Sequence, residues 1–255
     1  MRPKLTDRLV AGAVFVYALA LYLLTVAPTA SLWDAGEYIA VVNKLEVSHP
    51  PGAPFYMLIG RFFSMFVPEE YVAVSVNLVS VLSSAGAVLL GHLVIVRLIR
   101  LWQRPEGTPP RALSEVGGFE RGVALAGGVV GACTFAVTDS FWFNAVEAEV
   151  YALSMFFTAA VVWLIVRWAD EALREEAALK RKQHSLFGLA SNRYLVLIAY
   201  LFGLAIGVHL LNLLALFFVA LIVFFTEYDR PEWSDKKRWG AIVGAGAASS
   251  AAFLF

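Results

Sequence analysis

The sequence has few of the features that characterise soluble or secreted enzymes. It contains a single cysteine, Cys133, which excludes an internal disulfide. Charged residues make up only 16% of its 255 positions, against about 25% in soluble domains. The sequence has no glycine-rich loop of the type that cradles phosphates, and no histidine, cysteine and carboxylate spacing that is typical of a metal site. We therefore expect neither a nucleotide-binding fold nor a dedicated metal centre, and no nucleic-acid partner.

Hydrophobic residues make up 60% of the chain, against roughly 45–50% in soluble domains. The apolar runs are long and lack the alternation of membrane barrels, so the sequence predicts an all-α integral membrane protein. The glycines Gly127, Gly128 and Gly131 predict close helix packing in one of these runs. About seven transmembrane helices are expected: Leu9–Ala27, Tyr71–Arg97, Val123–Thr138, Ala152–Trp168, two short helices within Tyr194–Phe225, and Gly240–Phe255.

The distribution of basic residues predicts the topology. Three of them precede the first apolar run, which places the N-terminus in the cytoplasm. The run Gly52–Val67 is interrupted by Arg61, and we interpret it as a short interfacial helix rather than a span. On that interpretation only Lys44 and Arg61, of the 20 lysines and arginines, lie outside the cytoplasm. Residues 28–70 then form a non-cytoplasmic loop of a multi-pass protein in a bacterial inner membrane or a plasma membrane.

Polar residues gather in this loop although it borders the bilayer. Asp34 and Glu37 are three residues apart, so their carboxylates share one face of a helix. His49 opens a His-Pro-Pro-Gly turn that stops any helix. Two later non-cytoplasmic loops contribute further polar residues, namely Glu149, His209 and Asn212. We expect all these groups to converge on one face of the membrane and to form a site there.

Four motifs in a fixed order resemble a known family: WDAGEY, HPPGAPFYMLIGR, FWFNAVEAEVYAL and LAIGVHLLNLL. They resemble the membrane glycosyltransferases catalogued as domain of unknown function 2723, and more distantly the protein O-mannosyltransferases of the GT-C class. The resemblance covers the chain from about Leu9 to Leu216. Full family members are longer, and this chain ends in an apolar run at Phe255. We therefore expect residues 1–255 to be a single GT-C module, incomplete at its C-terminus.

The resemblance implies a reaction. A sugar, mannose or another hexose, would move from a polyprenyl-phosphate carrier to a Ser or Thr hydroxyl of an exported protein. Asp34 matches the catalytic aspartate of the family, and Glu37 takes the place of its accompanying acid. A carboxylate can take the proton of the attacking hydroxyl, and we prefer this role for Asp34 to the simpler one of capping a helix N-terminus. Glu37 has two open roles, orienting Asp34 or pairing with Lys44.

The remaining candidates are assigned to donor or acceptor binding, each beside a simpler role. Arg61 offers a fork suited to phosphate, or it extends to lipid headgroups. His49 contacts substrate or fixes its turn. His209 and Asn212 lie three apart on one helix face, and line the cavity or support helix packing. Glu149 is preferred to Glu147 as the acid that points into the site.

Two other functions stay open. A transporter or lipid-carrier flippase would use the same acids for substrate or proton binding, but would predict inverted repeats and acids at mid-membrane. A non-catalytic membrane scaffold would tolerate loss of Asp34 and Glu37 together. We expect no cofactor, while a divalent cation held by these two carboxylates is left open.

Overall fold

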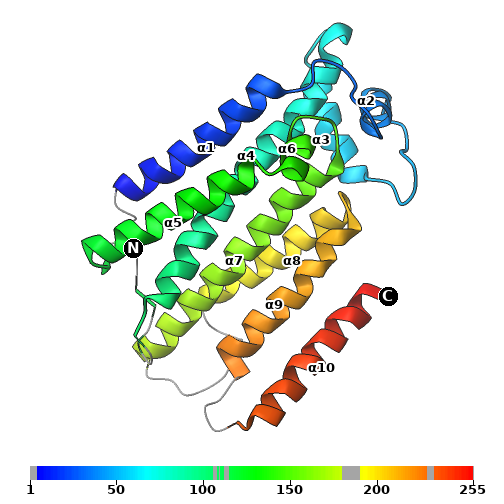
Figure 1. The fold of residues 1–255 in the computed structure, drawn as a ribbon. Helices are drawn as coiled ribbons and strands as arrows, with labels where there is room; N and C mark the ends of the chain where they lie inside the picture. The colour runs from blue at the N-terminus through cyan, green and yellow to red at the C-terminus, as the bar shows by residue number, and fades with distance from the viewer. Residues whose placement is uncertain are drawn as a thin grey trace.

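The computed structural model describes residues 5–105, 108, 110–111, 115–179, 190–228 and 233–254. Every regular element within these ranges is a helix. The predicted all-α class is confirmed. The principal helices, shown in Figure 1, are α1 (Leu5–Thr25), α2 (Ala35–Lys44), α3 (Pro54–Ser64), α4 (Val72–Trp102), α5 (Gly118–Ala136), α6 (Asp139–Ala145), α7 (Val150–Leu179), α8 (Arg193–Ile206), α9 (Ala215–Val223) and α10 (Asp235–Leu254). Short 3-10 turns occupy Glu69–Tyr71, Ala190–Asn192 and Leu210–Leu214, and a π turn occupies Phe224–Tyr228.

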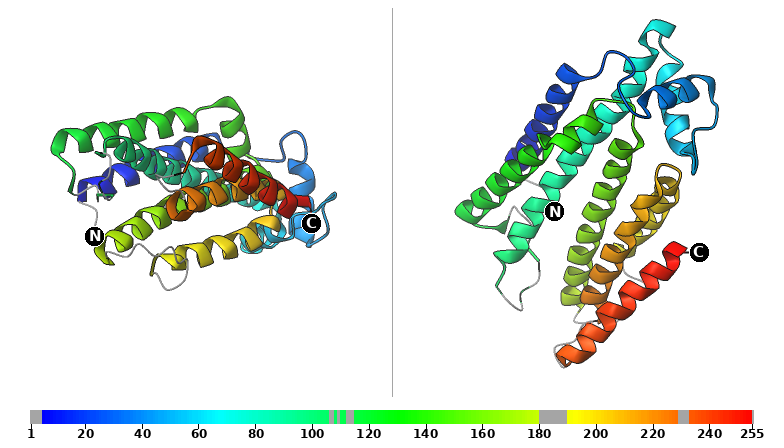
Figure 2. Two further views of the ribbon diagram at one scale, coloured as in Figure 1. Left: turned by 90° about the horizontal axis from the view of Figure 1, so that it is seen from below. Right: turned by 45° about the vertical axis from the view of Figure 1, so that its right-hand side comes forward.

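Helix α4 is the centre of the bundle. It packs against α1, α5 and α7, while α7 also contacts α8 and α9, and α10 lies against α9. Figures 1 and 2 show these long helices running side by side. The predicted close packing of the glycine-rich helix is confirmed, because a methyl group at Gly128 would collide with the side chains of Val96 and His92.

Four described helices are long and apolar enough to cross a membrane: Leu5–Thr25, Glu69–Trp102, Val150–Ala177 and Leu210–Glu227. Helices α5 and α6, which meet at an angle of 71° across a short break, would add a fifth candidate if the pair forms one span. The segment Ala190–Ile206 is apolar but shorter. The expected count of seven spans is therefore not confirmed. Phe255 lies outside the described residues, and the expectation of an incomplete module stays a prediction.

The first loop folds into two short helices. Helix α3 has 11 residues, or about 16 Å at about 1.5 Å per residue, which is half of a ~30 Å hydrocarbon core. It buries Tyr56, Met57 and Gly60 against the protein and exposes Leu58 and Phe62. This length and this division of faces agree with the interpretation of α3 as an interfacial helix.

Three loops meet at one end of the bundle, at the upper right of Figure 1. The predicted break in the run Tyr194–Phe225 is confirmed, because α8 ends at Ile206 and the next turn begins at Leu210. The N–H of Phe55 donates to the carbonyl of Gly207 at 2.8 Å, and the N–H of Ala27 donates to the carbonyl of Val146 at 2.9 Å. Backbone hydrogen bonds thus join the first loop to both of the later ones.

Candidate functional site

Asp34 stands at the start of α2, at the junction of the three loops. It occupies the N-cap position, and its side chain makes no capping hydrogen bond. The side chain is exposed. The preceding residue, Trp33, has a left-handed backbone with φ of 61° and is 83% exposed. The carboxylate is therefore accessible at the helix N-terminus, where the helix dipole favours its charge. The capping role that the sequence left open for its side chain is not seen, because the side chain makes no capping hydrogen bond.

Glu37 is held by the His-Pro-Pro turn. One of its carboxylate oxygens accepts the backbone N–H of His49 at 2.7 Å, and the other lies 3.1 Å from the ring Nδ1 of His49. The backbone hydrogen bond, followed by the side-chain bond, lowers the pKa of Glu37 below its ordinary value. Glu37 therefore pairs with His49, a partner that the sequence analysis did not name, rather than with Lys44. A role for Glu37 in orienting Asp34 stays a prediction. The turn is closed by the N–H of Gly52, which donates to the His49 carbonyl at 2.9 Å.

Glu149 brings an acid from the second loop to the junction. It is buried just before α7, and burial raises the pKa of its carboxyl to about 7. The nearby carboxylates of Asp34 and Glu147 add to the rise, while backbone hydrogen bonds from Val150 and Asp34 oppose it. An acid with a pKa near neutrality can accept or donate a proton under physiological conditions. Glu149 is thus both close to Asp34 and poised to exchange protons.

Glu147 is also buried and has a structural partner. Its carboxylate accepts the hydroxyl of Ser31, and burial raises its pKa. Only 2% of the residue is exposed. This contact ties the first loop to the segment before α7, whereas Glu149 is the acid beside Asp34. The preference for Glu149 as the acid that points into the site stays a prediction.

Two tyrosines complete the junction, and the sequence analysis missed both because they resemble ordinary apolar positions. Tyr38 packs edge-on against Tyr56, with ring centroids 5.4 Å apart, and tilts against His49 at 5.8 Å. Burial, and then the charges of Glu149 and Asp34, raise the pKa of Tyr38. Tyr38 therefore stays neutral with its hydroxyl proton in place. The signal that could have found it is its position one turn after Asp34, on the same face of α2.

Arg61 does not join the carboxylates. Its guanidinium donates to the backbone carbonyl of Asn43 at 2.5 Å and to the Asn43 side chain at 3.1 Å. Asn43 follows Asp34 by nine residues, which places it about 14 Å further along α2 at about 1.5 Å per residue. In this conformation Arg61 holds the C-terminal end of α2 against α3. A role in phosphate binding stays a prediction.

The third loop contributes two residues in different settings. His209 begins the turn Leu210–Leu214, its Nδ1 accepts the N–H of Leu211 at 3.2 Å, and its ring lies 5.2 Å from that of Tyr151. Burial lowers its pKa. Asn212 is buried, and its side chain makes hydrogen bonds to Ser154, Thr158, Ala205 and His209. These four bonds support helix packing for Asn212, and its binding role stays a prediction.

Three side chains of the first loop could hold a metal ion. One ligand atom each from Asp34, Glu37 and His49 lies within 4.8 Å of the other two. Two carboxylates and an imidazole suit a divalent transition metal. The Nδ1 of His49, however, already faces the Glu37 carboxylate, so the cluster is also accounted for by that contact alone.

One family model matches most of the chain and shows which family it belongs to. The model of the "Protein O-mannosyl-transferase TMEM260 N-terminal domain" matches residues 34–232, a range that includes every candidate residue named above. The chain belongs to this family.

Curated members of the TMEM260 family are much longer than this chain. The protein O-mannosyl-transferase tmem260 of Dictyostelium discoideum is 24% identical over 222 residues, which are 85% of this chain and 23% of the relative. The protein O-mannosyl-transferase TMEM260 of Mus musculus is 27% identical over 164 residues, or 64% of this chain and 20% of the relative. The chain thus spans less than a quarter of either relative's length. No solved structure matches it.

Proposed function

We propose that this chain is the membrane-embedded part of a GT-C type glycosyltransferase that moves a hexose from a polyprenyl-phosphate carrier to a Ser or Thr hydroxyl of an exported protein. The observation that carries the proposal is the placement of Asp34 and Glu149 together, from two different loops, within a family of protein O-mannosyl-transferases. Asp34 begins α2 and Glu149 directly precedes α7, both at the end of the bundle where the three loops meet. This placement supports a site at the membrane surface rather than a path through its middle.

Asp34 acts as the general base in this mechanism. The acceptor hydroxyl oxygen attacks the anomeric carbon of the donor sugar as its proton passes to the Asp34 carboxylate. A new carbon–oxygen bond forms to the acceptor, and the bond between the anomeric carbon and the carrier phosphate breaks. The polyprenyl phosphate leaves with the bonding electron pair. The exposure of the Asp34 side chain fits this role, because both substrates must reach it.

Glu149 and Tyr38 bind and orient the reactants. With a pKa near 7, Glu149 is largely protonated in mildly acidic conditions and can then donate a hydrogen bond to a phosphate or a sugar oxygen. Tyr38 keeps its proton, and both of its ring neighbours, His49 and Tyr56, belong to the first loop. The pair formed by Glu37 and His49 holds the turn that frames Asp34.

The test is transfer of labelled mannose from polyprenyl-phosphate mannose to a peptide rich in Ser and Thr, in membranes that contain the chain. Asp34→Asn keeps the size of the side chain but removes the base, so transfer is expected to fall by about 10²–10⁴-fold. The control is Asp139→Asn, an exposed acid in the first turn of α6, which should leave transfer unchanged.

Two results would count against the proposal. Transfer by Asp34→Asn at the control rate, with equal protein in the membrane, would remove Asp34 from the mechanism. Movement of the lipid-linked sugar across the membrane with no transfer to peptide would indicate a flippase instead.

A further inference from the structure

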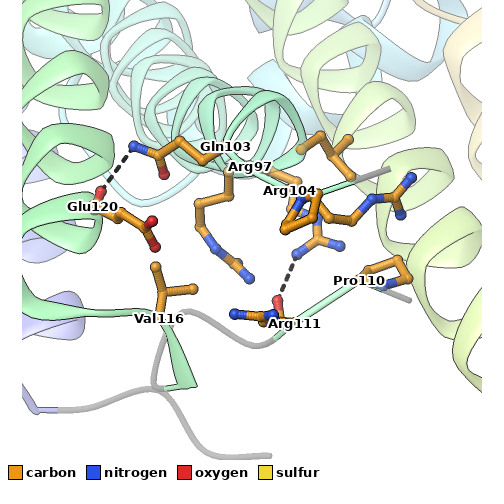
Figure 3. A pocket seen from close by; sticks show the side chains of 10 residues that line it. Arg97, Gln103, Arg104, Pro110, Arg111, Val116 and Glu120 are labelled. Carbon is orange, nitrogen blue, oxygen red and sulfur yellow. Dashed lines mark hydrogen bonds between the residues drawn. The ribbon is translucent and has the colours of Figure 1, made fainter. Parts of the chain in front are cut away.

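A second polar site lies at the other end of the bundle. A cavity open to solvent is lined by residues from the C-terminal end of α4, the following loop and the start of α5. Figure 3 shows Arg97, Arg104 and Arg111 around it, with Gln103 and Glu120 on one side and Pro110 on the other. Helix α4 begins at Val72, at the end of the bundle where the first loop and Asp34 lie. Arg100 follows Val72 by 28 positions, or about 40 Å along the helix. The cavity is therefore remote from Asp34 and plays no part in the chemistry proposed there.

Positive charge dominates this cavity. Four arginines line it, Arg97, Arg100, Arg104 and Arg111, against one glutamate, Glu120. The other carboxylates nearby are already engaged: Asp170 pairs with Arg97, Asp7 pairs with Arg121, and Glu115 attracts Arg100. Within the described part of the chain, Arg104 and Arg111 have no ion-pair partner.

Several polar atoms at the cavity are buried without a partner. Among the described residues, the Nε atoms of Arg97 and Arg100 and the side-chain oxygen of Gln103 make no hydrogen bond. The Arg97 side chain is only 11% exposed, so water reaches it poorly. Guanidinium N–H groups left unpaired in such a place are costly, and an anion that accepts from them removes that cost.

The surroundings of the cavity identify the source of the anion. Trp102 and Phe119 adjoin lining residues of the cavity in the chain, and they are 89% and 85% exposed. Leu98 lies one helical turn before Trp102 in α4 and is half exposed. Exposed aromatic side chains at the end of an apolar helix are typical of the membrane–water interface. Basic pockets between transmembrane helices at that level suit phosphate-bearing headgroups. The apolar surface below the cavity suits acyl chains.

We propose that this arginine cavity binds the phosphate of an anionic phospholipid, through Arg100 and Arg104, with the lipid's acyl chains lying along α4. The site is separate from the proposed transfer site and does not depend on the chain being a glycosyltransferase.

The test compares lipid retention by the purified chain in neutral detergent, measured by native mass spectrometry with phosphatidylglycerol or phosphatidylcholine at equal mole fraction. The wild-type chain should retain phosphatidylglycerol preferentially. Arg100→Gln with Arg104→Gln should reduce that preference by about tenfold or more, because hydrogen bonds between charged groups are lost. The control, Arg193→Gln with Lys237→Gln, also removes two positive charges, at exposed positions outside the cavity, and should keep the preference.

Further arms make the outcome decisive. Should the double variant fail to fold, Arg104→Gln alone tests the same cavity, because Arg104 is only half-buried. Retention of phosphatidylglycerol by the cavity variants at the wild-type level would overturn the proposal. Displacement of the lipid by excess inorganic phosphate, together with stabilisation of the lipid-free chain by phosphate alone, would also overturn it, because the site would then be one for soluble phosphate.

Discussion

Replacing Glu149 with glutamine should stabilise the protein in alkaline conditions and leave its stability almost unchanged in acid. The pKa of Glu149 is about 7 in the folded chain, against an ordinary value of 4.5. The folded state therefore binds the Glu149 proton more tightly than the unfolded state, so stability falls as the pH rises from about 4.5 to about 7 and then levels off. At about 1.4 kcal/mol per pH unit the loss amounts to about 3 kcal/mol. Glutamine carries no charge and avoids this loss.

The assay is thermal unfolding of the purified chain in mild detergent at about pH 5 and about pH 8, followed by tryptophan fluorescence. Glu149→Gln should raise the unfolding temperature at the higher pH, on the order of 5–10 °C for about 3 kcal/mol in a chain of this size. At the lower pH the gain should shrink to a small part of this. Glu46→Gln is the control, because Glu46 is an exposed acid of the same loop. An equal gain at both pH values, or no gain at either, would refute the argument that Glu149 is a buried acid with a raised pKa.

Three further predictions follow from the packing and the site. Gly128→Ala should lower the free energy of unfolding by about 1–3 kcal/mol through overpacking. The control is Gly122→Ala, which should not lower it, because the added methyl group meets nothing within 4 Å. Equal thermal stability of the two variants would contradict the close contact of α4 and α5. Asn212→Ala should cost about 0.5–2 kcal/mol in thermal unfolding, because the hydroxyls of Ser154 and Thr158 lose their acceptor; an unchanged unfolding temperature would argue against the packing role. Mannose transfer should survive a chelator such as EDTA, since His49 already pairs with Glu37, and a loss reversed by added Mn²⁺ would instead place a cation between the side chains of the first loop.

Patterns of short range predicted much of the fold. The apolar runs predicted the helices, the motif around His209 predicted the break between α8 and α9, and the glycines of α5 predicted its close contact with α4. These features depend on residues near one another in the sequence. Helix ends were less predictable: α4 continues to Trp102 and α7 to Leu179, because charged side chains are tolerated in a helix once it leaves the apolar layer.

The candidate site depended on contacts across the chain, which a sequence does not display. Asp34 and Glu149 are 115 positions apart, and only the meeting of two loops puts their charges together. Arg61 was expected near the carrier phosphate. The partner of a long, flexible side chain depends on which acceptors the tertiary fold brings within reach, and for Arg61 that acceptor is Asn43. Tyr38 was hidden by its apolar neighbours, since an aromatic residue at helical spacing resembles a core position.

Mass spectrometry of exported proteins tests the central claim most directly. Cells that express the gene with Asp34→Asn are compared with cells that express the wild type and cells that express the Asp139→Asn control. The account predicts that a hexose present on particular Ser or Thr peptides in the wild type and the control is lost in Asp34→Asn. Identical hexose modification in all three strains would contradict it.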